Sequence, residues 1–129
     1  MDRAALERWI EAYERAWRTA GTDALAELFA PDATYLTGPY HEPHRGLQAI
    51  ADLWEAEREG PDEAFTMKSE IVAVEGDTGV ARIEVAYVDP VDQEWRDIWI
   101  VRLDEHGRAV AFEEWPFAPE DDGGGPPKG

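Results

Sequence analysis

Apolar side chains near the start of the chain recur every three or four positions, which is typical of one face of a helix. Between residues 3 and 20 this set comprises Leu6, Trp9, Ile10, Tyr13, Trp17 and Ala20. Asp2 is suited to cap the start of this helix, and Gly21 is suited to end it in a left-handed conformation. We expect Trp9 to lie in the core. Tyr13 and Trp17 are better suited to a pocket wall, because their polar tips need partners when buried.

Two shorter helices are predicted after the first. One spans residues 22–30, and Pro31 should stop it because proline breaks a helix interior. Residues 33–37 then predict a strand. The other helix spans 46–59, where a Gly-Pro pair ends it.

From residue 65 the apolar positions alternate, which is typical of strands with one buried face. Four strands are predicted, over 65–74, 80–88, 94–103 and 108–117. The segment 75–79 has the glycines of a tight hairpin turn. Helices followed by an antiparallel meander indicate an α+β domain, with the helices on one face of a bent sheet.

Both faces of the third predicted strand carry large apolar residues. Trp95, Trp99 and Val101 alternate with a second set, which comprises Arg96, Ile98 and Ile100. Helices can cover only one face of such a sheet. We therefore expect a homodimer through the outer face of the sheet.

The charge and composition exclude several classes of protein. A net charge of −17 argues against binding nucleic acid or an anionic membrane surface. The absence of cysteine excludes disulfides, thiolate metal sites and cysteine nucleophiles. No signal or membrane-spanning segment is evident, so we expect a cytoplasmic protein. Residues 1–118 should form one domain, and the acidic, Gly/Pro-rich segment 119–129 a disordered tail.

The loop after the first predicted strand contains two histidines that could act as acid or base. They are His41 and His44, and histidine is the residue type best suited to acid–base work near neutral pH. As metal ligands they form a weak pair, because Pro43 prevents a helical arrangement and no third ligand is obvious. The alternative is that both are exposed loop residues. No metal or other cofactor is predicted.

Several segments together resemble the nuclear transport factor 2-like superfamily, and within it the SnoaL-like, or polyketide-cyclase-like, branch. The matching segments are 12–17 in the first helix, 24–35, 46–50, and Gly107 with Glu113, Glu114 and Trp115 in the closing strand. The resemblance covers residues 3–117. It implies a cystatin-like α+β cone, in which three N-terminal helices pack on a strongly curved antiparallel or mixed sheet. It also implies a deep apolar pocket and a dimer through the outer sheet face.

The resemblance also implies an acidic residue on the last strand, which Glu114 matches. We expect Arg96 to face the same cavity, together with Ile98 and Ile100. An Arg–Glu pair there could be a catalytic dyad or a buried ion pair, and both alternatives stay open. The positions where epoxide-hydrolase-like members carry Arg and Asp are Val85 and Tyr87 here. The position of the isomerase-like aspartate has no acid before Glu42.

We therefore predict a pocket for a small apolar or aromatic molecule. The expected ligand-binding residues are aromatic and comprise Tyr13, Trp17, Tyr35, Tyr40, Trp54, Tyr87 and Phe112. Glu114 and Arg96, with His41 or His44, would carry out acid–base chemistry of isomerase, cyclase or hydrolase type without a cofactor. The alternative is a non-catalytic dimeric binding or scaffold domain in which side chains fill the pocket.

Overall fold

The computed structural model describes residues 1–57, 64–89 and 92–119, which form three helices and one six-stranded sheet. The helices are α1 (Arg3–Arg18), α2 (Leu25–Leu28) and α3 (Leu47–Glu57). The strands are β1 (Phe29–Leu36), β2 (His44–Arg45), β3 (Ala64–Glu75), β4 (Thr78–Asp89), β5 (Gln93–Leu103) and β6 (Ala109–Phe117). Most of the predicted tail, residues 120–129, lies outside the described residues.

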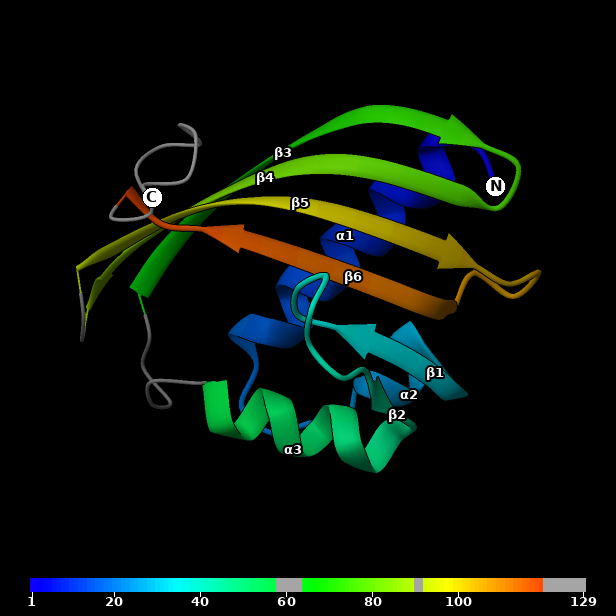
Figure 1. Cartoon of the computed structure of the whole chain (residues 1–129), viewed down its shortest axis with the longest axis horizontal. Coiled ribbons are helices and arrows are strands. Elements are labelled where there is room, and N and C mark those ends of the chain that lie inside the picture. The colour runs from blue at the N-terminus through cyan, green and yellow to red at the C-terminus, as the bar shows by residue number, and fades with distance from the viewer. Residues whose placement is uncertain (58–63, 90–91, 120–129) are drawn as a thin grey trace.

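The sheet is mixed and strongly curved. Its strand order is β2-β1-β6-β5-β4-β3, and only β1 and β6 among these strands run parallel to each other. Figure 1 shows α1 lying across one face of the sheet, with α3 beside β1 and β2 at the lower edge. This arrangement confirms the predicted α+β cone. No helix in the described part of the chain is both long and apolar enough to cross a membrane.

α1 forms where the spacing of apolar residues predicts it. Asp2 caps its start, since an Oδ1 atom accepts a hydrogen bond from the Ala5 amide at 2.8 Å. Arg15 and Arg18 lie in the last turn, where positive charge is favourable. The helix ends earlier than the predicted residue 20, because Thr19 is already extended and its amide bonds to the Ala16 carbonyl.

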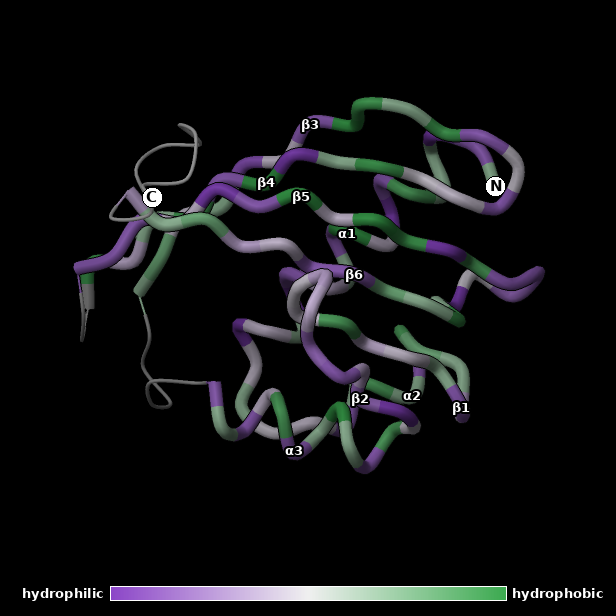
Figure 2. Tube along the Cα trace, in the orientation of Figure 1, coloured by the Kyte–Doolittle hydropathy of each residue, from purple (hydrophilic) through white to green (hydrophobic). Residues whose placement is uncertain are grey.

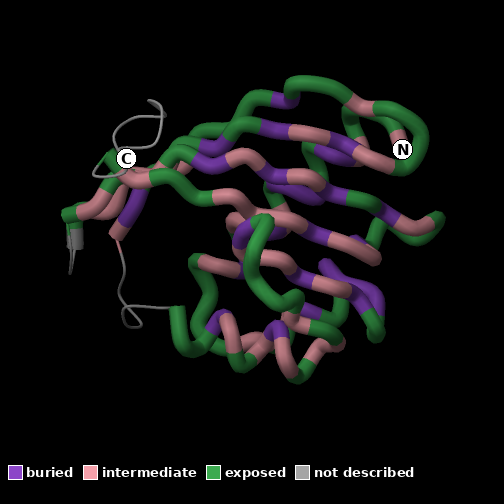
Figure 3. Tube along the Cα trace, in the orientation of Figure 1, coloured by how far each residue is buried: buried purple, intermediate pink, exposed green. Residues whose placement is uncertain are grey.

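The core is a cluster of aromatic rings between α1 and the concave face of the sheet. Trp9 is buried, as predicted, and its ring meets Phe29 and Trp99 edge-on. Its indole N–H donates to the Leu28 carbonyl at 2.9 Å, so the one polar atom of the ring is satisfied. Buried residues line α1 and the middle of the central strands (Figure 3). Burial of these rings fixes α1 against the sheet.

The predicted helix 22–30 is wrong at its end. α2 is a single turn, and Phe29 and Ala30 already belong to β1. Pro31 therefore lies inside a strand rather than ending a helix. The register of β1 against β6 shifts between Phe29 and Thr34, and this irregularity removes the need for an amide hydrogen bond at Pro31.

Gly46 joins the short strand β2 to α3. Its φ of +89° lies in the left-handed region, which favours glycine, and its amide donates to the Ala33 carbonyl at 2.8 Å. Strand β2 pairs antiparallel with β1, and no sequence pattern predicted it. The Gly-Pro pair expected to end α3 lies outside the described residues.

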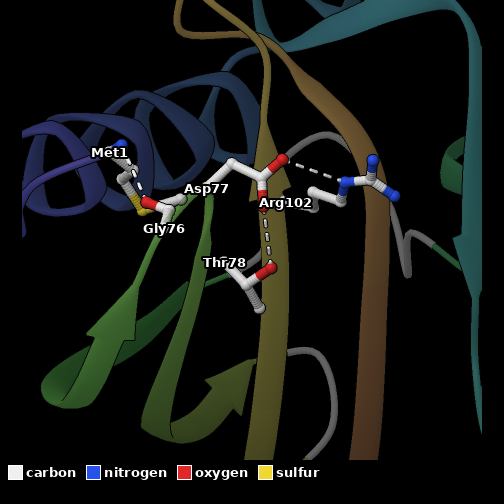
Figure 4. A network of polar contacts seen from close by, with 5 residues as sticks. All are labelled: Met1, Gly76, Asp77, Thr78 and Arg102. Atoms are coloured by element: carbon white, nitrogen blue, oxygen red, sulfur yellow. Dashed lines mark hydrogen bonds and ion pairs between the residues drawn. The ribbon is translucent and has the colours of Figure 1, made fainter.

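The hairpin between β3 and β4 is the tight turn that its glycines predict. Glu75 pairs with Thr78 across a two-residue turn. The amine of Met1 donates to the Gly76 carbonyl at 2.9 Å, and Arg102 of β5 donates to Asp77 at 3.2 Å (Figure 4). The Arg102 hydrogen bond lowers the pKa of the Asp77 carboxyl. These contacts tie the turn to α1 and to the adjacent strand.

Hydrophobic and hydrophilic residues alternate along the long strands (Figure 2). On β5 the inward set is Trp95, Asp97, Trp99 and Val101, and the outward set is Arg96, Ile98 and Ile100. The predicted register, with Arg96 beside Glu114, is therefore wrong. Trp99 is the residue directly opposite Glu114 on β6. The large rings fill the concave face, and one step along a strand reverses the face of every side chain.

Candidate functional site

A cavity of about 330 Å³ lies between the helices and the concave sheet. Every long strand, β1 and two of the helices contribute to its wall. The lining residues are Tyr13, Trp17, Tyr35, Thr37, Leu53, Trp54, Glu57, Phe65, Met67, Val85, Tyr87, Gln93, Trp95, Asp97, Trp99, Glu114 and Pro116. Its volume lies at the small end of the range of small-molecule sites, which is about 300–1,000 Å³.

Aromatic rings in contact with one another form much of the wall. Tyr13 packs against Trp99 with ring centroids 4.5 Å apart, and against Trp54 at 5.0 Å. The Trp17 ring meets Trp54 at 4.9 Å and donates its indole N–H to the Tyr87 hydroxyl at 3.1 Å. Rings held on several sides lose little entropy when a ligand binds, so the wall is preorganised.

Two carboxyl groups, from neighbouring strands, meet at the cavity. Glu114 lies opposite Trp99, and Asp97 lies two residues before Trp99 on the same face. Asp97 is only 7% exposed, and the Trp99 indole N–H donates to its Oδ2 at 3.4 Å. Among the described groups no hydrogen-bond partner reaches its Oδ1. The pair therefore combines burial with incomplete hydrogen bonding, which disfavours two negative charges.

Burial and mutual repulsion raise both pKa values. Loss of water around Glu114, followed by the nearby charge of Asp97, raises the pKa of Glu114 to about 8. Burial raises the pKa of Asp97 to about 6. Each of the two carboxyl groups lies close enough to affect the pKa of the other. Near neutral pH the pair therefore holds about one proton.

Two tyrosines extend this pair to α1. The Tyr35 hydroxyl donates to Oε2 of Glu114 at 3.1 Å, and the Tyr13 and Tyr35 hydroxyls are 2.7 Å apart. A tyrosine hydroxyl has only one proton to donate. When Tyr35 donates its proton to Glu114, the hydrogen bond between the two tyrosines must be donated by Tyr13. Burial and then the charge of Glu114 raise the pKa of both tyrosines well above 10. Both stay neutral and act as donors.

Five of the seven predicted ligand-binding aromatics line the cavity, namely Tyr13, Trp17, Tyr35, Trp54 and Tyr87. Phe112 is 1% exposed and lies in the core beneath Tyr35 and Trp99 rather than at the cavity surface. Tyr40 is 99% exposed, so its predicted place in the wall is wrong. The turn from Gly38 to His41 directs its ring into solvent.

Of the four predicted catalytic residues, only Glu114 lines the cavity. Arg96 is 72% exposed on the outer face, where it pairs with Glu84 and Glu94. His41 is exposed and hydrogen-bonded to Thr37, and His44 lies in β2 at the sheet edge. The histidines are not brought to Glu114. No group of three or more metal-binding side chains occurs within 1–57, 64–89 and 92–119.

Asp97 is the acidic residue that sequence reasoning missed. The resemblance places further acids at the positions of Val85 and Tyr87 and in the loop before Glu42, and none of these positions is acidic here. The signal was present in β5, because Asp97 alternates in step with Trp95, Trp99 and Val101. A single acid within an aromatic strand face indicates a buried carboxyl that needs a partner.

Within the described part of the chain, every charged residue of the cavity wall is acidic. The three are Glu57, Asp97 and Glu114. Arg18 contacts one wall residue from outside the lining set, with its guanidinium 4.0 Å from the centroid of the Phe65 ring. Arg18 is itself bound by Glu14 at 2.8 Å. The cavity is therefore an aromatic site with a negative electrostatic potential.

Several solved structures share the fold of this chain. The chain is similar to a candidate isomerase of the SnoaL-like family from Agrobacterium tumefaciens, with 18% identity, 88% of this chain and 98% of that chain covered, and a TM-score of 0.70. It is similar to a candidate polyketide cyclase from Sinorhizobium meliloti, with 25% identity, coverage of 85% and 97%, and a TM-score of 0.65. An epoxide hydrolase from M. tuberculosis has 16% identity, coverage of 85% and 80%, and a TM-score of 0.62.

The sequence alone points to the same family. No curated protein matches the chain at a significant level. The family model of the SnoaL-like domain matches residues 7–112, which include most of α1, all of α2, α3 and β1–β5, and the start of β6. The chain therefore belongs to the SnoaL-like domain family.

Proposed function

We propose that the cavity binds a small apolar or aromatic molecule and carries out acid–base chemistry on it without a cofactor. The reaction would be of isomerase, cyclase or hydrolase type. The observation that carries this proposal is the placement of two carboxyl groups, the buried Asp97 and the half-buried Glu114, together at the wall of an aromatic cavity, where their pKa values are raised to about 6 and about 8. Groups that titrate near the working pH transfer protons most effectively.

The pair can serve as base and acid in one step. Asp97, with the lower pKa, removes a proton from a carbon next to a carbonyl group of the ligand. Glu114, with the higher pKa, gives its proton to the carbonyl oxygen, and an enol forms. The pair again holds one proton, now on Asp97. Asp97 returns this proton to a different carbon while the enol O–H returns its proton to Glu114, which completes an isomerisation and restores the pair. The tyrosine donors Tyr13 and Tyr35 stabilise the negative charge left on Glu114.

A thermal-shift screen against steroid, aromatic polyketide and terpenoid ligands tests whether the cavity binds such molecules. A ligand at one hundred times its dissociation constant adds about 2.7 kcal/mol to the free energy of unfolding. Each ligand that stabilises the protein is then incubated with wild type, Asp97→Asn and Glu114→Gln, and its conversion is followed by NMR. We expect conversion by wild type and a loss of at least about a hundredfold in either variant.

Glu113→Gln is the matched control, because it makes the same Glu-to-Gln change at the neighbouring residue, on the opposite face of the same strand. It should leave both binding and conversion unchanged. Binding without conversion, equally in all four proteins, would favour the alternative of a non-catalytic binding domain. Stabilisation by none of the ligand classes would contradict the proposed binding of a small apolar molecule.

We further propose a homodimer through the outer face of the sheet. Apolar residues on this face remain partly exposed in the single chain, and they comprise Val80, Ile98, Ile100, Trp115 and Phe117. Light scattering on a sizing column should give twice the mass of the chain, and Ile98→Glu should give one chain mass. A monomeric wild type would contradict this proposal.

We also propose a cytoplasmic location.

A further inference from the structure

We infer that the ligand of this cavity is an organic cation, a protonated amine or quaternary ammonium group on a small apolar body. This inference deepens the proposed function and rests on it, since it requires the cavity to hold a ligand. It names the charge of that ligand, which the proposed acid–base chemistry leaves open.

The first argument is the charge of the wall. Each charged side chain that lines the cavity within the described ranges is a carboxyl group, and neither lysine, arginine nor histidine lines it there. A carboxylate or phosphate ligand would bring a further negative charge next to Asp97 and Glu114 without a counter-ion. Unpaired charge of this kind is costly in a buried site, so anionic ligands are disfavoured.

The second argument is the aromatic surface. The faces of Trp, Tyr and Phe rings attract cations, and clusters of such rings bind ammonium groups. Tyr13, Trp54 and Trp99 form one continuous patch, with Trp17 beside Trp54. The chain already makes one contact of this kind at the cavity wall, where the Arg18 guanidinium packs over Phe65. The wall is therefore suited to a cation as well as to a neutral ring.

The third argument is the unmet hydrogen-bonding capacity of Asp97. Its Oδ1 is buried, and no N–H group of the described residues donates to it. The proton that the carboxyl pair holds near neutral pH offsets part of this cost. An ammonium N–H, or the positive field of a quaternary nitrogen, would replace that proton and would stabilise both carboxylates in their charged forms.

Binding of a cation should therefore release protons. The titratable groups that face Glu114 come from four other elements, and they are Tyr13 of α1, Tyr35 of β1, Asp97 of β5 and Glu57 of α3. The tyrosines stay neutral near pH 7, so the proton that leaves is the one shared by the carboxyl pair. The affinity for a cation should rise with pH between about 6 and about 8, the pKa values of the pair.

Three probes of similar shape and different charge test the inference: 2-phenylethylammonium, 2-phenylethanol and phenylacetate. Alkylammonium groups titrate near pH 10, so the first stays cationic through the whole range. Calorimetric titration at pH 8 should give an affinity at least about tenfold higher for the ammonium probe than for the alcohol, and no binding of phenylacetate. At pH 7, the heat measured for the ammonium probe should vary with the ionisation enthalpy of the buffer.

Variants test whether the preference for a cation comes from the charge of the Asp97–Glu114 pair or from the shape of the cavity. Asp97→Asn should reduce the preference for ammonium over alcohol at least about tenfold and should retain binding of the alcohol. Glu113→Gln, which removes a charge from the other face of β6, should keep the preference of wild type. A quaternary probe, 2-phenylethyltrimethylammonium, has no N–H donor. It should still bind, because the aromatic rings of the wall attract its positive charge.

Equal binding of the ammonium and alcohol probes, or tighter binding of the alcohol, would overturn the inference and leave the proposed function intact. Binding of phenylacetate at least as tight as that of the ammonium probe would overturn it as well. If the neutral ligand panel stabilises the protein and the ammonium probe does not bind, the inference fails alone. If neither panel nor probes bind, the proposed function fails with it.

Discussion

On the concave face of the sheet, Asp97 and Glu114 lie together among aromatic rings. On the convex face, Arg96 and Glu84 form an ion pair in solvent. Both pairs join neighbouring strands, and both involve β5. The concave pair combines two acids with no described base, and its pKa values rise. The convex pair combines opposite charges, which attract each other in solvent.

The difference shows which charges this fold can use for chemistry. A surface ion pair is screened by water and contributes about 0–1 kcal/mol. A like-charge pair that is removed from water retains a proton near neutral pH and can give or take it. Adjacent residues, Arg96 and Asp97 or Glu113 and Glu114, therefore have unlike properties because they point to opposite faces.

The largest expected effect concerns a tryptophan on each face. Trp99→Ala removes a ring that is 2% exposed and packs against Trp9, Tyr13 and Phe112. It should lower the free energy of unfolding by about 3–5 kcal/mol at any protein concentration. Trp115→Ala on the convex face should cost about 1 kcal/mol in a single chain.

Urea denaturation at two protein concentrations measures both changes. A cost for Trp115→Ala that grows with concentration would support the proposed dimer, since a dimer interface couples stability to concentration. Equal costs for the two tryptophans in dilute solution would contradict the contrast between the faces.

The next effect concerns the protonation of Glu114. Its folded pKa of about 8 exceeds the ordinary glutamate value of 4.5, so the folded state binds more protons than the unfolded state between these values. Stability is therefore lost as pH rises through this window. Glu114→Gln should stabilise the protein by about 1–3 kcal/mol at pH 8 and leave it nearly unchanged at pH 4.

Thermal unfolding across this pH range measures the difference, and Glu113→Gln is the control on the other face. The control should stay within about 0.5 kcal/mol of wild type throughout. A Glu114→Gln variant that is less stable than wild type at pH 8 would show that the Glu114 carboxylate is favourably paired in the folded protein.

The sequence was sufficient for the fold, and for most of the cavity wall, but not for the acid–base pair. Helical spacing at Trp9, Tyr13 and Trp17 and alternation along β3–β6 are local signals, and the structure confirms them. The face on which Arg96 lies depends on the register between β5 and β6, which alternation cannot decide when both faces are apolar. Asp97 was missed for the same reason. Tyr40 lies outside the cavity because a turn, rather than hydrophobicity, decides its direction.

A smaller effect is expected from the tyrosine that donates to the pair. Tyr35→Phe removes the hydrogen bond that stabilises the Glu114 carboxylate, so the pKa of Glu114 should rise further, by about one unit. An NMR titration of the Glu114 carboxyl carbon measures this change. Tyr13→Phe removes a hydroxyl one hydrogen bond farther away and should have a smaller effect on the same pKa. A lower pKa of Glu114 in Tyr35→Phe would contradict the direction of this hydrogen bond.

The smallest effect separates the two possible registers of β5. Arg96 is 72% exposed, and its contacts to Glu84 and Glu94 are 3.4 and 3.6 Å long. Arg96→Gln should therefore change the free energy of unfolding by less than about 0.5 kcal/mol, and added salt should remove even that difference. In the register that places Arg96 beside Glu114, the same substitution would leave a buried carboxylate without its partner and would cost about 3–5 kcal/mol. Denaturant unfolding of this one variant distinguishes these values, and a large cost would mean that Arg96, rather than Asp97, is the partner of Glu114.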